Sequence, residues 1–296
     1  MSHLLTNICN FIVVKVLPFK IPKPENNALI YQEDNGVAFY NKLHQHEEIQ
    51  ISVIFKGEGD LVVGDTINRY SENDIVVIGS NLPHLFRSDE SITIESSMLT
   101  LFFTKESFGK LFFELIELKE LESLFRKINT GIRLTNNKEE IISTFSNLKD
   151  ASHLERFIHF LTILKNIATS KSEPLSSFIY QRIYTEDEGE RMSNVMNYAM
   201  AEFNRDISLN QIAEVANMTP NAFCRYFKQR TNKTFFQFLA EIRLEHSCRL
   251  ITKNKDLSIS EVSDLSGFKN MSNFNRKFKQ YKGLTPTAFR KSSTLP

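Results

Sequence analysis

The chain has 296 residues, of which 41% are hydrophobic and 24% charged, with 25 phenylalanines and no tryptophan. This length suffices for about two packed domains, and the composition excludes a disordered or fibrous protein. Cys9, Cys224 and Cys248 are odd in number and share no metal-ligand spacing, which argues against a disulfide framework and favours a reducing cytoplasm. We expect no membrane-spanning or secretory segment.

The formal net charge of +1 hides an uneven distribution. Residues 190–296 hold 17 lysines and arginines against 9 acidic residues, whereas residues 1–189 hold 19 against 26. A basic last third on an acidic body favours a polyanionic partner for that third alone. The alternative explanation is a chance fluctuation of surface charge.

The N-terminal part is predicted to consist of short strands. Residues 8–19 are apolar but interrupted by Lys15 and too short to cross a bilayer, so we expect a strand there. Glycines stand at the turns between further predicted strands, a pattern typical of a small barrel or jelly roll. These strands are expected at 28–32, 37–41, 49–55, 60–63, 74–78 and 92–103.

Residues 105–169 change to helical periodicity, with two apolar stripes at helical spacing. The stripes either complete the core of the same domain or form a surface that pairs two copies of the chain. Segment 170–189 mixes serine, proline and acidic residues and is predicted to link domain 1–169 to domain 190–296. The stripes comprise Phe108, Leu111, Phe112, Leu115 and Ile116, then Leu154, Phe157, Ile158, Leu161, Leu164 and Ile167.

An internal repeat marks the C-terminal domain. Residues 208–229 align with 258–280, so that 227–229 and 278–280 both read Phe-Lys-Gln. In each copy a short helix is expected to stop near Asn217 or Gly267, and the next to start at the capping residue Thr219 or Asn270. This punctuation is typical of a helix-turn-helix, and residues 235–251 are predicted to join the two units as one helix.

The second helix of each unit is expected to enter the major groove of DNA, which accommodates an α-helix. Phenylalanines at 223, 227, 274 and 278 are predicted to face the core, which leaves polar side chains outside. Asparagine, serine and arginine can read base edges, while lysine suits phosphates. The predicted DNA-binding residues are Asn221, Cys224, Arg225, Lys228, Ser272, Asn275, Arg276 and Lys279.

Residues 190–291 resemble the DNA-binding domain of the AraC-type (AraC/XylS) family. The resemblance is carried by Asp264, Gly267-Phe268, residues 274–279, Gly283, Thr285-Pro286 and Phe289-Arg290. It implies that the two units bind adjacent major-groove segments of promoter DNA, about 10 bp apart. It also implies RNA polymerase as a partner, with activation of transcription as the commoner outcome.

A second resemblance lies in the N-terminal region, where the segments 44–48, 57–59, 74–78 and 82–84 are similar to a cupin barrel. In that fold two histidines of one strand and a later one can converge on a metal ion, and His44 and His46 share one face of a strand. Gln50 stands where an enzyme-type site has a carboxylate. We therefore expect neither metal, cofactor nor catalytic residue.

His44, His46, Gln50 and His84 are instead interpreted as ligand-facing or structural, at the mouth of the barrel. An apolar lining is expected from Ile49, Ile51, Val53, Phe55 and Ile78.

The sequence thus predicts an α+β protein: a cupin-like barrel at about 28–104, a helical extension at 105–169, and an all-α domain with two helix-turn-helix units. The leading hypothesis is a cytoplasmic, homodimeric transcription regulator controlled by a small molecule in the barrel. One alternative is a DNA-binding regulator whose barrel only dimerises. The other is a metal-dependent cupin enzyme that also touches DNA.

Overall fold

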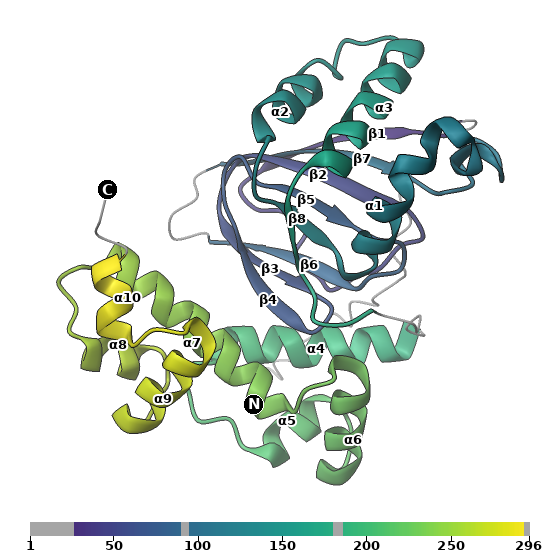
Figure 1. Ribbon diagram of the computed structural model, residues 1–296. Helices are drawn as coiled ribbons and strands as arrows, with labels where there is room; N and C mark the ends of the chain where they lie inside the picture. The colour runs from purple at the N-terminus through teal and green to yellow at the C-terminus, as the bar shows by residue number, and fades with distance from the viewer. Residues whose placement is uncertain (1–26, 90–94, 180–185, 293–296) are drawn as a thin grey trace, which may run out of the picture.

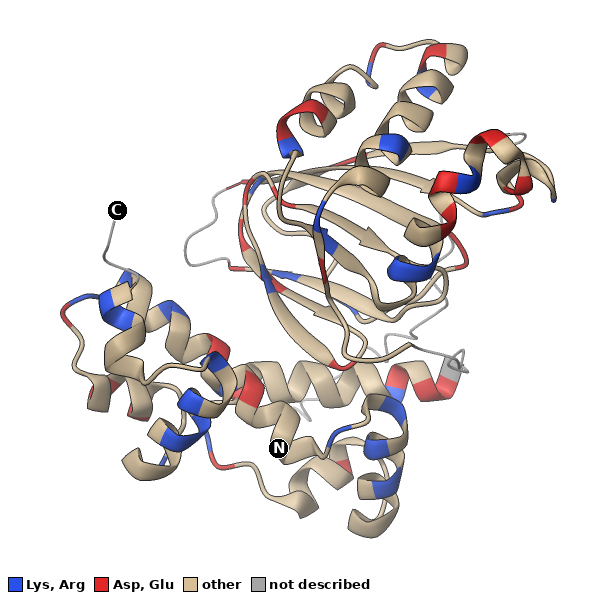
Figure 2. Cartoon of the chain, in the orientation of Figure 1, with Lys and Arg blue, Asp and Glu red and all other residues tan. Residues whose placement is uncertain are grey.

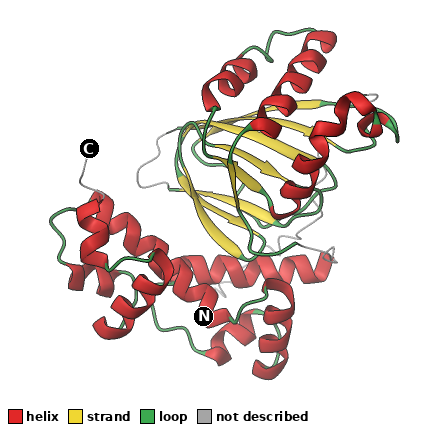
Figure 3. Ribbon diagram, in the orientation of Figure 1, coloured by secondary structure: helices red, strands yellow, loops and turns green. Residues whose placement is uncertain are grey.

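The computed structural model describes residues 27–89, 95–179 and 186–292, and it has the predicted α+β architecture (Figures 1 and 3). A β-barrel with helices on one side sits on a purely helical C-terminal domain. The strand predicted at 8–19 lies outside the described residues. Within them, no helix is both long enough and apolar enough to span a bilayer.

The barrel is built from two antiparallel sheets that face each other. The larger sheet has the order β1-β7-β2-β5-β8-β9, and the smaller has the order β4-β3-β6. The strands are β1 (Ile30–Gly36), β2 (Ile49–Lys56), β3 (Gly59–Val63), β4 (Thr66–Tyr70), β5 (Ile75–Ile78), β6 (His84–Ser88), β7 (Ser96–Phe103), β8 (Ile132–Leu134) and β9 (Ser172–Pro174). The strand predicted at 37–41 does not form, and the sequence reading missed β4, β6, β8 and β9.

The two faces of β2 have different roles. Ile49, Ile51 and Val53 pack outward, in a core shared with the helices that cover the large sheet. Ile54 packs inside the barrel with Ile78. Because side chains alternate along a strand, Gln50 also faces the interior, where it pairs with Ile78. The predicted apolar lining is therefore wrong for Ile49, Ile51, Val53 and Phe55 and correct only for Ile78.

Helices α1 (Glu122–Lys127), α2 (Lys138–Ser146) and α3 (His153–Thr169) cover the large sheet. The first apolar stripe does not form one α-helix, because residues 112–121 adopt short 3₁₀ turns. α3 matches the second stripe and starts at a capping box, in which Ser152 and Glu155 each bond the other's backbone amide. Its Leu164 and Ile167 are buried, while Leu154 and Ile158 are exposed.

The first half of the predicted linker is part of the barrel domain. β9 extends the large sheet by pairing with β8, and Leu175 is fully buried. The Ser177 backbone N–H donates a hydrogen bond to Asp65 at 2.9 Å. The C-terminal domain then begins with α4, Glu186–Glu202.

The C-terminal domain contains two helix-turn-helix units, as predicted. The first is formed by α5 (Leu209–Val215) and α6 (Pro220–Thr231), the second by α8 (Ile259–Leu265) and α9 (Met271–Lys282). Between them runs α7 (Phe235–Lys253), and α10 (Pro286–Ser292) closes the domain. Helix α4 lies along the small sheet of the barrel (Figure 1). There Leu43, Val62, Ile67 and Leu85 share one apolar core with α4.

Candidate nucleic-acid interface and barrel site

Local signals set the start of α6 and α9. Thr219 Oγ1 accepts a hydrogen bond from the Ala222 backbone N–H at 3.4 Å, and Asn270 Oδ1 accepts one from that of Asn273 at 3.0 Å. The turns before them use left-handed residues at equivalent places, Asn217 with φ 51° and Gly267 with φ 79°. Both caps and both turns are thus confirmed, and they orient the second helix of each unit.

The phenylalanines at 223, 227, 274 and 278 are fully buried, as predicted, and anchor α6 and α9 in their domain. All eight predicted DNA-binding residues are exposed on these two helices. Arg276 Nη2 donates a hydrogen bond to Asn273 Oδ1 at 2.9 Å, which holds its guanidinium at the helix surface.

Both helices lie on the side of the molecule away from the barrel, and lysines and arginines mark this side (Figure 2). Helix α7 connects the two units without interruption, so it fixes the orientation of α6 relative to α9. The arrangement presents two exposed polar helices on one face, as a protein that binds successive turns of duplex DNA requires.

The predicted barrel residues come together in one cluster. His44 and His84 form an antiparallel bridge through two backbone hydrogen bonds, of 3.0 and 2.9 Å. One ring nitrogen of each of His44, His46 and His84 lies within 4.8 Å of the others. Gln50 Oε1 lies 3.2 Å from His46 Nε2 and 3.1 Å from His84 Nε2. The cluster is buried in the barrel, since Gln50 is only 3% and His84 0% exposed.

Burial sets the protonation state of these histidines. It lowers the pKa of His44 to about 4 and holds the pKa of His46 and His84 below the ordinary value. For His84 the neighbouring imidazoles lower the pKa further. All three are therefore neutral near pH 7, with one N–H each.

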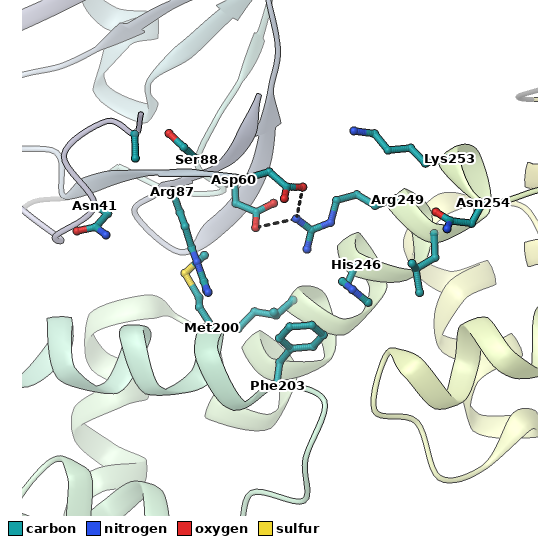
Figure 4. A pocket seen from close by; sticks show the side chains of 14 residues that line it. Asn41, Asp60, Arg87, Ser88, Met200, Phe203, His246, Arg249, Lys253 and Asn254 are labelled. Carbon is teal, nitrogen blue, oxygen red and sulfur yellow. Dashed lines mark hydrogen bonds and ion pairs between the residues drawn. The ribbon is translucent and has the colours of Figure 1, made fainter. Parts of the chain in front are cut away.

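A cavity of about 620 Å³ lies between the barrel and α7 (Figure 4). The barrel contributes Asp60 and Arg87 to its wall, and the C-terminal domain contributes Met200, His246 and Arg249. Across it, Arg249 Nη1 lies 3.4 Å from Asp60 Oδ2 and 3.7 Å from Asp89 Oδ2, while Lys253 pairs with Glu58. These contacts could not be predicted from the sequence, because the partners are far apart in the chain.

Comparisons with known proteins agree with this architecture. Residues 212–292 match a family model described as a helix-turn-helix domain, and residues 27–101 match one described as an AraC-like ligand binding domain. An uncharacterised HTH-type transcriptional regulator of Bacillus subtilis, YdeC, is 25% identical over 93% of this chain and 94% of its own. The melibiose operon regulatory protein of Escherichia coli is 19% identical over 84% and 83%.

Among solved structures, ToxT from Vibrio cholerae covers 90% of this chain and 98% of its own, with 14% identity and a TM-score of 0.36. The family-model match at residues 27–101 lies on the barrel, and the match at residues 212–292 lies on the two helix-turn-helix units. The chain therefore belongs to the AraC/XylS family of DNA-binding transcription regulators, with an N-terminal AraC-like ligand-binding domain.

Proposed function

We propose that the protein reads promoter DNA with α6 and α9, each in its own major-groove segment about one helical turn from the other. The observation that supports this is the pair of capped helices, related by the internal repeat, that expose Asn221, Arg225, Asn275 and Arg276 on the side away from the barrel. Arginine forks onto guanine and asparagine onto adenine, so these four side chains would supply specificity. Lys228 and Lys279 would bind phosphates.

The protein acts as a homodimer in this proposal. Leu154 and Ile158 stand on the same exposed face of α3, 69% and 53% exposed, and Ile116, in the 3₁₀ segment before α1, is 73% exposed. Exposed apolar side chains gathered on the covering helices are typical of an interface between subunits. Sedimentation of the wild type and of a Leu154→Glu, Ile158→Glu variant tests this. A dimer that persists in the variant would place the interface elsewhere.

Effector control is proposed to act through the cavity between the barrel and α7. A molecule that binds there contacts both domains, so its affinity depends on how they sit against each other, which is the requirement for coupling. A metabolite panel that raises the melting temperature of the wild type, but not of a Leu250→Trp variant that fills the cavity, would support this site. Equal stabilisation of both proteins would place the effector site outside this cavity.

Selection of sheared genomic DNA on the purified full-length protein tests the whole proposal. We expect a few promoter fragments that share two short motifs about one turn apart. Reporter expression from these promoters in cells with and without the protein then shows whether it activates or represses transcription. Recovery of random fragments would contradict sequence-specific binding.

A further inference from the structure

In each of the three histidines of the cluster, the ring nitrogen Nδ1 lies within hydrogen-bond distance of a backbone carbonyl oxygen. Nδ1 of His46 lies 2.9 Å from the Glu48 carbonyl oxygen, and Nδ1 of His84 lies 2.8 Å from that of Leu82. His44 Nδ1 lies 2.8 Å from the Lys42 carbonyl oxygen. A carbonyl oxygen can only accept, so the single proton of each neutral imidazole sits on Nδ1.

The Nε2 atoms of His46 and His84 are consequently hydrogen-bond acceptors, and they lie close to a third acceptor, Gln50 Oε1. With Nδ1 protonated, Nε2 of His46 and of His84 each carries a lone pair, and both face Gln50 Oε1 at 3.2 and 3.1 Å. Gln50 holds this orientation by donating from Nε2 to Ser52 Oγ at 2.8 Å, and Ser52 in turn bonds Thr100 Oγ1 at 2.8 Å. Buried acceptors that face one another without a donor are unfavourable, and a cation among them would satisfy all of them.

The barrel also supplies what surrounds a metal ion bound by imidazoles. Donation from the second ring nitrogen to a carbonyl group fixes the ring and makes the ligand nitrogen more basic. The Glu48 carboxylate, in a residue only 5% exposed, lies 3.7 Å from His46 Nδ1 and adds a negative charge beside the cluster. The ring of His46 meets Phe102 edge-on at 5.4 Å, which shields the site on one side.

We propose that His44, His46 and His84, with Gln50 Oε1 as a fourth ligand, bind one divalent first-row transition-metal ion inside the barrel. Imidazole nitrogens suit Zn²⁺, Co²⁺, Ni²⁺ and Fe²⁺, whereas Mg²⁺ and Ca²⁺ prefer oxygen ligands. Bonds of about 2.1 Å to each nitrogen require the three rings to rotate inward from their separation of up to 4.8 Å. The expectation of no metal rested on the missing carboxylate at position 50, whose place the amide oxygen takes.

The rival arrangement is a rotated amide. Gln50 would then donate from Nε2 to both imidazoles and accept from Ser52, so that the lone pairs are satisfied and no cation is needed. The two arrangements differ in one measurable property, the affinity for a metal ion. Affinity for a metal ion does not depend on DNA binding. The metal-site proposal can therefore fail while the proposed DNA-binding function holds, and the proposed function can fail while the metal site is real.

The experiment uses the full-length protein without a histidine tag, stripped with a chelator and titrated with CoCl₂ and then ZnCl₂. We expect one Co²⁺ per chain with visible d–d absorption of a nitrogen-rich site, displaced by Zn²⁺, and a higher melting temperature with Zn²⁺. His46→Gln and His84→Gln should each weaken Zn²⁺ binding by at least roughly 10- to 100-fold. Loss of a residue that merely hydrogen-bonds a metal ligand already costs that much, and these variants lose a ligand itself. His153→Gln, at an exposed histidine on α3, is the matched control and should bind as the wild type does.

Less than one metal ion bound per chain would overturn the proposal in favour of the rotated amide. An affinity that is the same in the wild type and the His46 variant would do so too. If the His84 variant does not fold, the wild-type titration and the His46 variant decide by themselves. Gln50→Glu supplies an anionic ligand and should tighten Zn²⁺ binding. Unchanged affinity in this variant would remove position 50 from the ligand set.

Discussion

Lys233 and Asp65 join the two domains: Lys233 Nζ lies 3.3 Å from Asp65 Oδ2 and donates a hydrogen bond to the Asp65 carbonyl oxygen at 2.9 Å. The Asp65 side chain is fully buried and also accepts hydrogen bonds from Ser176 and Ser177. Burial alone would raise its pKa, but the Ser177 hydrogen bonds and Lys233 hold the pKa below the ordinary value. The β3–β4 turn, the segment after β9 and the start of α7 thus meet at one carboxylate.

Replacing Lys233 with alanine should destabilise the protein by about 1–3 kcal/mol, because a buried carboxylate loses its cation while its serine donors remain. Urea unfolding at pH 7 measures the change. Asp65→Asn combined with Lys233→Ala should show a coupling energy of about 0.5–3 kcal/mol. Lys255→Ala, at an exposed loop lysine, is the control and should stay within about 0.5 kcal/mol. A Lys233 variant as stable as that control would show that the contact does not hold the domains together.

Arg225→Ala and Arg276→Ala should each cost about 1–3 kcal/mol of binding to a selected site and relax the base preference there. Lys279→Ala should instead weaken specific and random DNA alike and flatten the salt dependence, since it loses only a phosphate contact. Fluorescence anisotropy at several salt concentrations separates these effects. The same loss on specific and random DNA for all three variants would contradict the division into readers and phosphate contacts.

A left-handed backbone conformation costs an alanine about 1–2 kcal/mol, and Gly267→Ala should lower the free energy of unfolding by more than this. The backbone φ at Gly267 is +79°, and an added Cβ would lie 2.7 Å from the Phe203 carbonyl oxygen. Asn217→Gly, at the equivalent turn of the first unit, is the matched control and should change stability little, since Asn217 already has φ 51°. If Gly267→Ala is neutral, the second turn does not need its glycine.

His246 is expected to make stability depend on pH. It lies on α7 with Nδ1 3.2 Å from Ser266 Oγ. Burial, with help from Arg249 and against the pull of Asp60 and Asp89, lowers its pKa to about 4. An unfolded histidine has a pKa of about 6.5, so the unfolded chain binds the proton more readily in between. The stabilising contribution is complete above about pH 6.5 and is lost as the pH falls towards 4.

Wild type should therefore lose about 2 kcal/mol more stability than His246→Asn between about pH 7 and pH 5. Urea unfolding of both proteins at each pH gives this difference, from which the other buried histidines cancel. His153→Gln should follow the wild type. Parallel pH profiles of the wild type and the His246 variant would mean that His246 keeps an ordinary pKa in the folded protein.

The helix-turn-helix units could be predicted from sequence because their signals are local. Caps at Thr219 and Asn270, left-handed turns at Asn217 and Gly267, and the repeated phenylalanines each act within a few residues. The barrel was predictable as a class of fold but not in detail. On β2 both faces are apolar or buried, so alternation alone did not tell which face the helices cover.

Contacts between distant segments left no trace in the sequence. Lys233 and Asp65 are 168 residues apart, and nothing near either residue indicates the other. The histidines were found as a motif, yet their meaning depends on ring orientation. Only the structure shows that Nδ1 of His46 and His84 faces the backbone and Nε2 faces Gln50.

Hydroxyl-radical footprinting on one selected promoter fragment tests the two-helix mode of binding most directly. The wild type should protect two segments on one face of the duplex, centred about 10 bp apart. Arg225→Ala should weaken protection and base preference in one segment only, and Arg276→Ala in the other only. A single protected segment, or the same segment affected by both variants, would contradict simultaneous binding by α6 and α9.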